Sequence, residues 1–212
     1  MDIKNIFLDR DGTIIEDRHY LCHPREIRFL PGAVLAMQTM TQAGCRLFVV
    51  TNQSGIGRGY FSLTDYQRVH ERLLELLAVR GVQIQDSAFC PHAPEKGCSC
   101  RKPGTGMWEK LCARHGLLAR ESVMLGDKKD DILFGQACGF RASMLLCTGK
   151  GRKTLAQLGL EPTLSQWSEP CSRALPGIPA AVARDLPAAW SWLQQRYANA
   201  SLGHACNSAG EP

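Results

Sequence analysis

The sequence lacks any apolar run close to the roughly 20 residues that a membrane-spanning helix needs, although 44% of its 212 residues are hydrophobic. Its first residues also lack the basic segment and apolar stretch of a secretory signal. We therefore predict a cytoplasmic protein without a membrane partner. The length allows one domain with a substantial hydrophobic core.

The positive charge is not concentrated anywhere along the chain. The formal net charge is +5, yet no tract of five or more basic residues occurs, and no internal repeat is visible. A net positive charge suits either nucleic acid or small anions. Because the basic residues are scattered, we predict a small anionic ligand and no nucleic-acid partner.

Short apolar runs alternate with helical patterns, which is typical of an α/β fold whose parallel sheet is covered on both faces. Strands are predicted at 3–8, 46–50, 82–89, 122–125 and 142–146. Helices are predicted at 31–43, between Ser62 and Gly81, at 108–115, at 130–138 and within 185–197. The segment "SLTD" at Ser62 resembles a helix-capping signal at the start of the second of these helices. We expect one domain over 1–198 and a disordered tail over 199–212.

Polar residues directly follow four of the predicted strands. Asp9 and Asp11 follow the first, Thr51–Ser54 follow the second, and Arg101–Lys102 come after the third. Asp127, Lys128, Asp130 and Asp131 follow the fourth. Since open parallel sheets bind ligands at the carboxyl ends of their strands, these side chains should meet on one rim.

This set of side chains suits phosphoryl transfer. The carboxylates of Asp9, Asp11 and Asp127 suit a hard cation such as Mg²⁺. Asp9 can attack phosphorus, and Asp11 can protonate the leaving oxygen and later activate water. Thr51 and Lys102 add a hydroxyl and a cation to stabilise the phosphoryl group. An isolated D-x-D is common, so the prediction depends on the order and placement of all four groups.

A second cluster lies in "CPHAPEKGCSC", which contains Cys90, His92, Cys98 and Cys100. Three thiolates and one imidazole form a closed tetrahedral set, as in structural zinc sites. The alternative is a loop with free thiols. A redox pair is disfavoured because the spacing is C-x-C and not C-x-x-C. We predict a structural zinc whose role is to fix the direction of Arg101 and Lys102.

The motifs also resemble a known group of enzymes. "FLDRDGTI", "VVTNQSGIGRG", "CRKP" and "LGDKKDD" resemble the four motifs of the haloacid dehalogenase (HAD)-type phosphatases. Together with "CPH…CSCRKP", they resemble the D-glycero-D-manno-heptose 1,7-bisphosphate 7-phosphatases and the related histidinol-phosphate phosphatases. The resemblance covers about residues 3 to 160. It implies a Rossmann-like HAD fold with a minimal cap.

The resemblance also implies an activity and a set of site residues. The activity is hydrolysis of the 7-phosphate of the heptose bisphosphate, a precursor of ADP-heptose and the lipopolysaccharide core, through an aspartyl-phosphate. Mg²⁺ would be held by Asp9, the Asp11 carbonyl and Asp127. The implied substrate contacts are Asp17, Arg18, His19, Tyr20, Thr51, Asn52, Gln53, Ser54, Arg101, Lys102 and Lys128.

Several alternatives stay open from the sequence. Histidinol phosphate is a rival substrate, but its amine needs an acidic partner that we cannot place from sequence. Arg101 and Arg58 favour a second anionic group, and we interpret 54–59 as a flexible, glycine-rich turn. A zinc-bearing nucleic-acid module would leave Asp9, Asp11 and Asp127 unexplained, and a non-catalytic scaffold would not need both aspartates of the D-x-D. No apolar stripe is left over after the core is assigned, so we predict a monomer.

Overall fold

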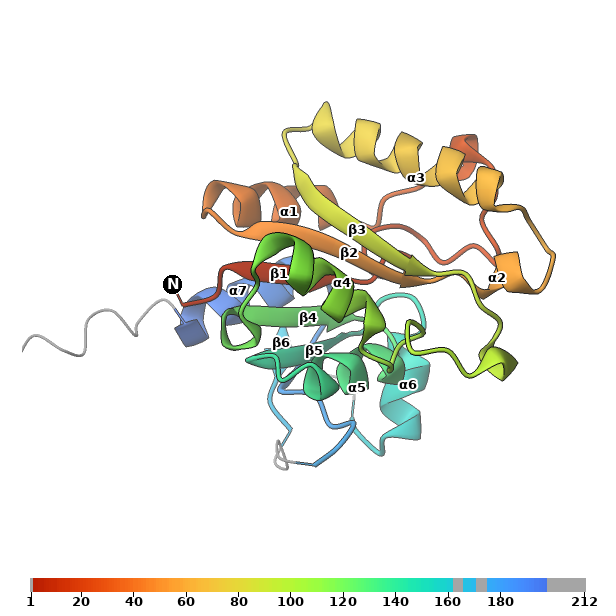
Figure 1. Ribbon diagram of the computed structural model, residues 1–212. Helices are drawn as coiled ribbons and strands as arrows, with labels where there is room; N and C mark the ends of the chain where they lie inside the picture. Colours follow the sequence, from red (N-terminus) through yellow and green to blue (C-terminus); the bar gives the residue numbers. More distant parts are fainter. Residues whose placement is uncertain (1, 162–165, 171–174, 198–212) are drawn as a thin grey trace, which may run out of the picture.

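A twisted, mostly parallel sheet forms the centre of the protein (Figure 1). The computed structural model describes residues 2–161, 166–170 and 175–197. Within these residues the strand order is β3-β2-β1-β4-β5-β7-β6, and only β6 is antiparallel to its neighbour. The strands are β1 Asn5–Leu8, β2 Arg46–Asn52, β3 Ile84–Cys90, β4 Ser122–Gly126, β5 Ala142–Leu146, β6 Trp167–Ser168 and β7 Ala181–Ala183.

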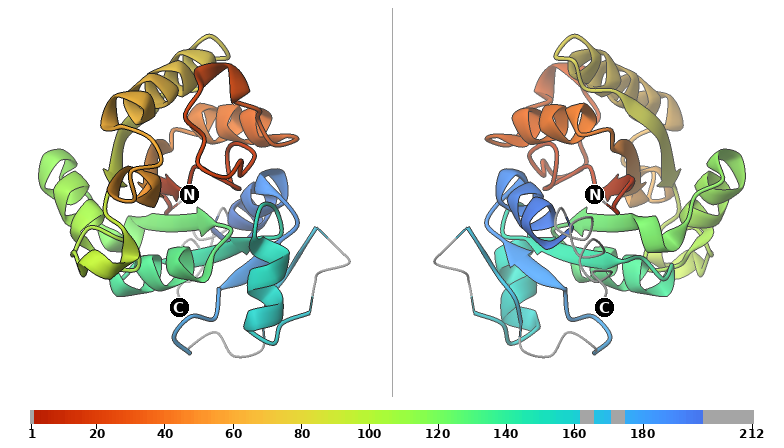
Figure 2. Two further views of the ribbon diagram at one scale, coloured as in Figure 1. Left: turned by 90° about the vertical axis from the view of Figure 1, so that its right-hand side faces the viewer. Right: turned by 90° about the vertical axis from the view of Figure 1, so that its left-hand side faces the viewer.

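Helices cover both faces of this sheet (Figure 2). One face carries α1 (Ala33–Gln42), α3 (Leu63–Ala78) and α7 (Leu186–Tyr197), and their apolar residues share one core with the sheet. The other face carries α4 (Gly106–His115) and α5 (Lys129–Ala137). Two short helices, α2 (Ser54–Gly57) and α6 (Gly151–Gln157), follow strands β2 and β5, and single 3-10 turns lie at Pro24–Glu26, Pro94–Lys96 and Ala119–Glu121.

The central strand β1 shows why the sequence forms this sheet. Successive side chains of a strand point to opposite faces. Ile6 and Leu8 accordingly join the core under α1, α3 and α7, whereas Phe7 joins the core under α4 and α5. All three are fully buried. Because both faces are covered, an uninterrupted apolar run is needed, and the first polar side chain after it emerges at the carboxyl edge.

The predicted fold is confirmed in its main elements, including the cap of α3. The Ser62 hydroxyl accepts a hydrogen bond from the Asp65 backbone N–H (3.1 Å), and the Asp65 carboxylate accepts one from the Ser62 N–H (2.9 Å). Strand β2 is longer than predicted, so Thr51 and Asn52 lie on the strand itself. Elements α6, β6 and β7 were missed because they are short and carry no clear periodicity.

Two other predictions concern membrane-spanning helices and the end of the chain. Among the described helices, none is both long and apolar enough to cross a membrane. The tail expected at 199–212 lies outside the described residues, as does residue 198 at the end of the expected domain.

Candidate active site

A pocket lies at the carboxyl edge of the sheet, where the ends of β1, β2 and β4 meet. The loops after β1, β2, β3, β4 and β5 all contribute to it. It is lined by every residue that the resemblance implied for substrate binding: Asp17, Arg18, His19, Tyr20, Thr51, Asn52, Gln53, Ser54, Arg101, Lys102 and Lys128. The structure therefore brings together residues that are far apart in the sequence.

Asp9 is the first polar side chain after β1 and is held on both carboxylate oxygens. Oδ1 accepts a hydrogen bond from Lys102 Nζ (3.0 Å), and Oδ2 accepts one from Lys128 Nζ (2.9 Å). Only 3% of the residue is exposed. Burial opposes ionisation, but the two ammonium groups outweigh it and hold the pKa of Asp9 well below its usual range. Asp9 is thus an ionised and immobile carboxylate, which suits a nucleophile.

Asp11 lies two residues further on and is fixed by different neighbours. The buried Arg10 guanidinium donates to both Asp11 oxygens through Nε and Nη2, at 2.9–3.2 Å. Gln53 Nε2 donates to Asp11 Oδ2 (2.8 Å) and also to the Thr51 hydroxyl (2.9 Å). The backbone turns sharply at Gly12 (φ 89°), where a Cβ atom would collide with the Asp127 carboxylate. The carboxylates of Asp9 and Asp11 therefore have different hydrogen-bond partners, although the two residues are close in sequence.

Three oxygens, one each from Asp9, Asp11 and Asp127, surround the Lys128 ammonium. Lys128 Nζ donates to Asp9 Oδ2 (2.9 Å), to the Asp11 carbonyl (3.0 Å) and to Asp127 Oδ1 (2.8 Å). These are the oxygens predicted to hold Mg²⁺, and oxygen ligands are what Mg²⁺ requires. The ammonium acts as a stand-in that shows the three oxygens can surround a single cation. The donor set therefore fits the predicted metal.

Asp127 carries a further sign of excess negative charge. Burial raises its pKa to about 7, and the carboxylates of Asp9 and Asp131 add to this rise against the Lys128 ammonium. The ligand oxygens of Asp9, Asp127 and Asp131 lie within 4.8 Å of one another. A divalent cation would relieve this crowding.

Asp131 belongs to the site but was given no role from the sequence. It is fully buried on the first turn of α5, where its carboxylate pairs with Lys102 Nζ (2.6 Å) and accepts from the Lys128 N–H (3.0 Å). Its position, four residues after Asp127, was visible in "LGDKKDD". Only the structure shows that one turn of helix returns it to the same cluster.

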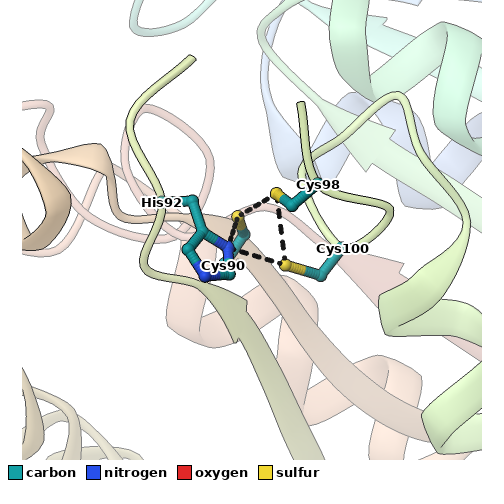
Figure 3. A group of neighbouring side chains, drawn as sticks. All are labelled: Cys90, His92, Cys98 and Cys100. Carbon is teal, nitrogen blue, oxygen red and sulfur yellow. Dashed lines mark hydrogen bonds between the residues drawn. The ribbon is translucent and has the colours of Figure 1, made fainter. Parts of the chain in front are cut away.

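The four predicted zinc ligands also meet (Figure 3). The separations are 3.6 Å from Cys90 Sγ to His92 Nδ1, 3.5 Å from Cys98 Sγ to both other thiols, and 3.3 Å from His92 Nδ1 to Cys100 Sγ. A disulfide needs about 2.05 Å between sulfurs, whereas the edges of a zinc–thiolate tetrahedron measure about 3.8 Å. The donor set and its spacing fit a closed zinc site.

Comparisons with known proteins agree with this geometry. The HAD-hydrolase-like family model matches residues 99–165. A D-glycero-beta-D-manno-heptose-1,7-bisphosphate 7-phosphatase of Neisseria meningitidis is 39% identical over 160 residues, which cover 75% of this chain and 85% of the relative. One of the same description from Pseudomonas putida is 40% identical over 164 residues, 76% and 93% of the two chains. The chain belongs to the heptose-1,7-bisphosphate 7-phosphatase family.

Solved structures lead to the same family. The D,D-heptose 1,7-bisphosphate phosphatase of B. bronchiseptica, complexed with magnesium and phosphate, is 34% identical, with a TM-score of 0.76. The comparison covers 92% of this chain and 99% of that one. The corresponding enzyme of Burkholderia thailandensis is 31% identical with a TM-score of 0.62, covering 90% and 97%. This protein is therefore a HAD-type phosphatase.

Two sequence interpretations of residues 54–59 need correction. This segment is not a flexible turn, because Ser54–Gly57 form helix α2, and the Gly57 N–H donates to the Pro91 carbonyl (2.8 Å). Arg58 pairs with Glu95 (3.5 Å) and is not among the residues that line the pocket. Gly57 allows a close approach of the two segments, since a Cβ atom there would collide with the backbone of Ala93. The glycine-rich segment thus packs against the Cys/His loop, and Arg58 lies outside the pocket lining.

Lys150 lines the pocket, and the sequence had not singled it out. It follows β5, in a loop that showed no motif of its own. Its backbone N–H donates to Asp127 Oδ2 (2.7 Å), and its side chain pairs with Asp17 (3.2 Å). Its place in the loop that follows a parallel strand was the one signal that could have identified it.

Proposed function

We propose that this phosphatase is Mg²⁺-dependent and hydrolyses the 7-phosphate of D-glycero-D-manno-heptose 1,7-bisphosphate through an aspartyl-phosphate. The observation that carries the chemistry is the ionised Asp9, with one oxygen on Lys102 and the other directed to the point where Asp11 and Asp127 also converge. The names and coverage of the relatives support the substrate.

Asp9, the Asp11 carbonyl and Asp127 would hold the magnesium ion, and magnesium would neutralise charge on the transferring phosphoryl group. The Lys128 ammonium uses the same three oxygens. Lys128 must therefore leave them when a metal binds. It lines the pocket, so it remains within the region that holds the substrate.

The protein groups divide the reaction between them. The Asp9 carboxylate attacks phosphorus, and the bond from phosphorus to the sugar oxygen breaks. Asp11 gives a proton to that oxygen and then takes one from the water that hydrolyses the aspartyl-phosphate. Thr51 and Lys102 stabilise the charge on the phosphoryl oxygens. The separate environments of Asp9 and Asp11 support these separate roles.

We further propose that Cys90, His92, Cys98 and Cys100 bind one structural zinc ion. The loop leads directly into Arg101 and Lys102, which both line the pocket. A closed tetrahedral site leaves no position for water, so this zinc would fix the chain and take no part in the reaction.

Purified protein should contain about one zinc per chain by metal analysis. Cys98→Ser should lower the retained zinc about tenfold or more after dialysis against a chelator, because one of four ligands is lost. The matched control is Cys112→Ser, which alters a half-buried thiol that donates to the Leu117 carbonyl. Equal zinc contents in the two variants would argue against the site.

Histidinol phosphate is the alternative substrate, and one observation bears on it. The structure places a carboxylate, Asp17, at the pocket, where it could hold an amine. Asp17 is, however, already paired with the Lys150 ammonium. We therefore expect kcat/KM for the heptose bisphosphate to exceed that for histidinol phosphate by at least about tenfold, which is roughly 1.4 kcal/mol. A tenfold preference for histidinol phosphate would reverse the assignment.

A further inference from the structure

The loop after β5 is fastened to the catalytic residues at several points. The Thr148 hydroxyl donates to the Gly12 carbonyl (2.6 Å), and the Lys150 N–H donates to Asp127 Oδ2 (2.7 Å). Gly149 lies between them with φ 50°, and a Cβ atom there would collide with Asp127 and Gly12. The position of the Lys150 Cα is therefore set by the site itself, and its side chain lines the pocket.

The Lys150 ammonium meets the carboxylate of Asp17, which comes from the loop after β1. The two groups are 3.2 Å apart, and 18% of the Asp17 side chain and 49% of the Lys150 side chain is exposed. Among the described residues, Asp17 has no other ion-pair partner and its Oδ2 accepts no hydrogen bond. Within the part of the chain that the structure describes, the Lys150 ammonium is thus the group that balances the negative charge of Asp17.

The ion pair between Asp17 and Lys150 changes the charge that this part of the pocket lining presents to a substrate. Asp17 alone would repel an anionic group and attract an amine. With Lys150 in place the carboxylate is neutralised, and the ammonium, still about half exposed, can also bind an anion. Arg101 lines the same pocket, and one of its guanidinium nitrogens is buried without a hydrogen-bond partner. Lys150 and Arg101 are thus two cations of the pocket lining, and the Asp17 carboxylate is paired with the first of them.

We propose that Lys150 is a specificity-determining residue that selects substrates with a second anionic group, both by binding that group and by masking Asp17. This rests on the proposed function for the identity of the bisphosphate. Electrostatic discrimination works partly through repulsion of the wrong substrate, and here the Lys150 ammonium would repel the amine. An anionic group can approach the exposed part of the Lys150 ammonium while the pair with Asp17 persists, whereas an amine cannot.

The test is the ratio of kcat/KM for a bisphosphate over that for the matching monophosphate. Two substrate pairs should be measured: heptose 1,7-bisphosphate with heptose 7-phosphate, and fructose 1,6-bisphosphate with fructose 6-phosphate. Lys150→Met should lower this ratio about tenfold or more, mainly through a higher KM for the bisphosphate. It should also raise kcat/KM for histidinol phosphate, because Asp17 becomes available to the amine.

A double variant separates the binding of the anionic group by Lys150 from the masking of Asp17, and a third variant serves as the control. Lys150→Met with Asp17→Asn should recover part of the lost ratio, since the repulsive carboxylate is gone, and should lose the gain on histidinol phosphate. The matched control is Lys153→Met, which alters an exposed lysine of α6 outside the pocket lining and should leave every ratio within about twofold.

An equal fall in kcat/KM on all substrates, or an unchanged ratio for both pairs in Lys150→Met, would overturn the inference. The proposed function is judged separately, by wild-type turnover of heptose 1,7-bisphosphate. If the wild type fails on that compound, the fructose pair still measures the effect of Lys150.

Discussion

Asp9→Asn should abolish phosphate release, with kcat lowered by at least about 10⁴-fold, while the protein stays folded. The amide cannot form the bond to phosphorus that the proposed mechanism requires. Removing a nucleophile from a set of groups that act together has effects of this size or larger. Mass spectrometry of acid-quenched enzyme should find phosphate on the peptide that contains Asp9 in the wild type and none in the variant.

The variant should fold because both lysines around Asp9 keep another carboxylate. Lys102 Nζ still pairs with Asp131 and donates to the Val50 carbonyl, and Lys128 Nζ still donates to Asp127. The matched control is Asp86→Asn, since Asp86 pairs with His115 (2.7 Å) near the start of β3, at the edge of the sheet opposite the pocket. It should lose little activity. Normal turnover by Asp9→Asn would refute the mechanism.

Lys102→Met should be the most destabilising of the single substitutions considered and should also lower kcat by about 10² to 10³-fold. Lys102 is 2% exposed and pairs with both Asp9 and Asp131, at 3.0 and 2.6 Å. Burial disfavours the ammonium, but Asp131 and Asp9 raise its pKa. Removing one partner of a buried ion pair costs about 3–5 kcal/mol, because the remaining charges stay buried and uncompensated. Urea unfolding should detect this as a lower midpoint.

A rescue experiment identifies the cause. Lys102→Met combined with Asp131→Asn removes one uncompensated charge together with the cation, so the double variant should regain part of the lost stability. Lys110→Met, on the exposed surface of α4, should change the free energy of unfolding by less than about 0.5 kcal/mol. A double variant as unstable as the sum of its parts would show that the charge balance is not the reason.

The sequence predicted which residues gather at the site better than how they pair with one another. Asp9 and Asp127 could be assigned because each directly follows an apolar strand of a parallel sheet, which places it on the carboxyl edge. Asp131 was seen in the same motif but received no role, because its ion pair with Lys102 exists only when α5 packs beside the loop after β3. Arg10 was passed over as the variable residue of the D-x-D, yet it is fully buried and holds Asp11.

The region after β5 was the least predictable. Helix α6 and strands β6 and β7 are short, and their sequence carries neither a clear helical nor an alternating pattern. Lys150 was missed for this reason. The glycine-rich segment before Tyr60 was misread because Gly57 packs closely against the backbone of the Cys/His loop and Gly55 against Phe61 and Tyr20, which sequence spacing does not reveal.

The sequence by itself determined the fold class, and it predicted four groups on one rim and two sets of metal ligands, whose side chains the structure brings together. These follow from local rules: a covered strand must be apolar, and the next residue must emerge at the edge. Only the tertiary structure decided which charges face each other. Lys102 and Lys128 reach Asp9 from 93 and 119 residues away along the chain. Coulombic attraction depends on distance in space, so the ionised state of Asp9, the crowding at Asp127 and the masking of Asp17 appear only in the folded chain.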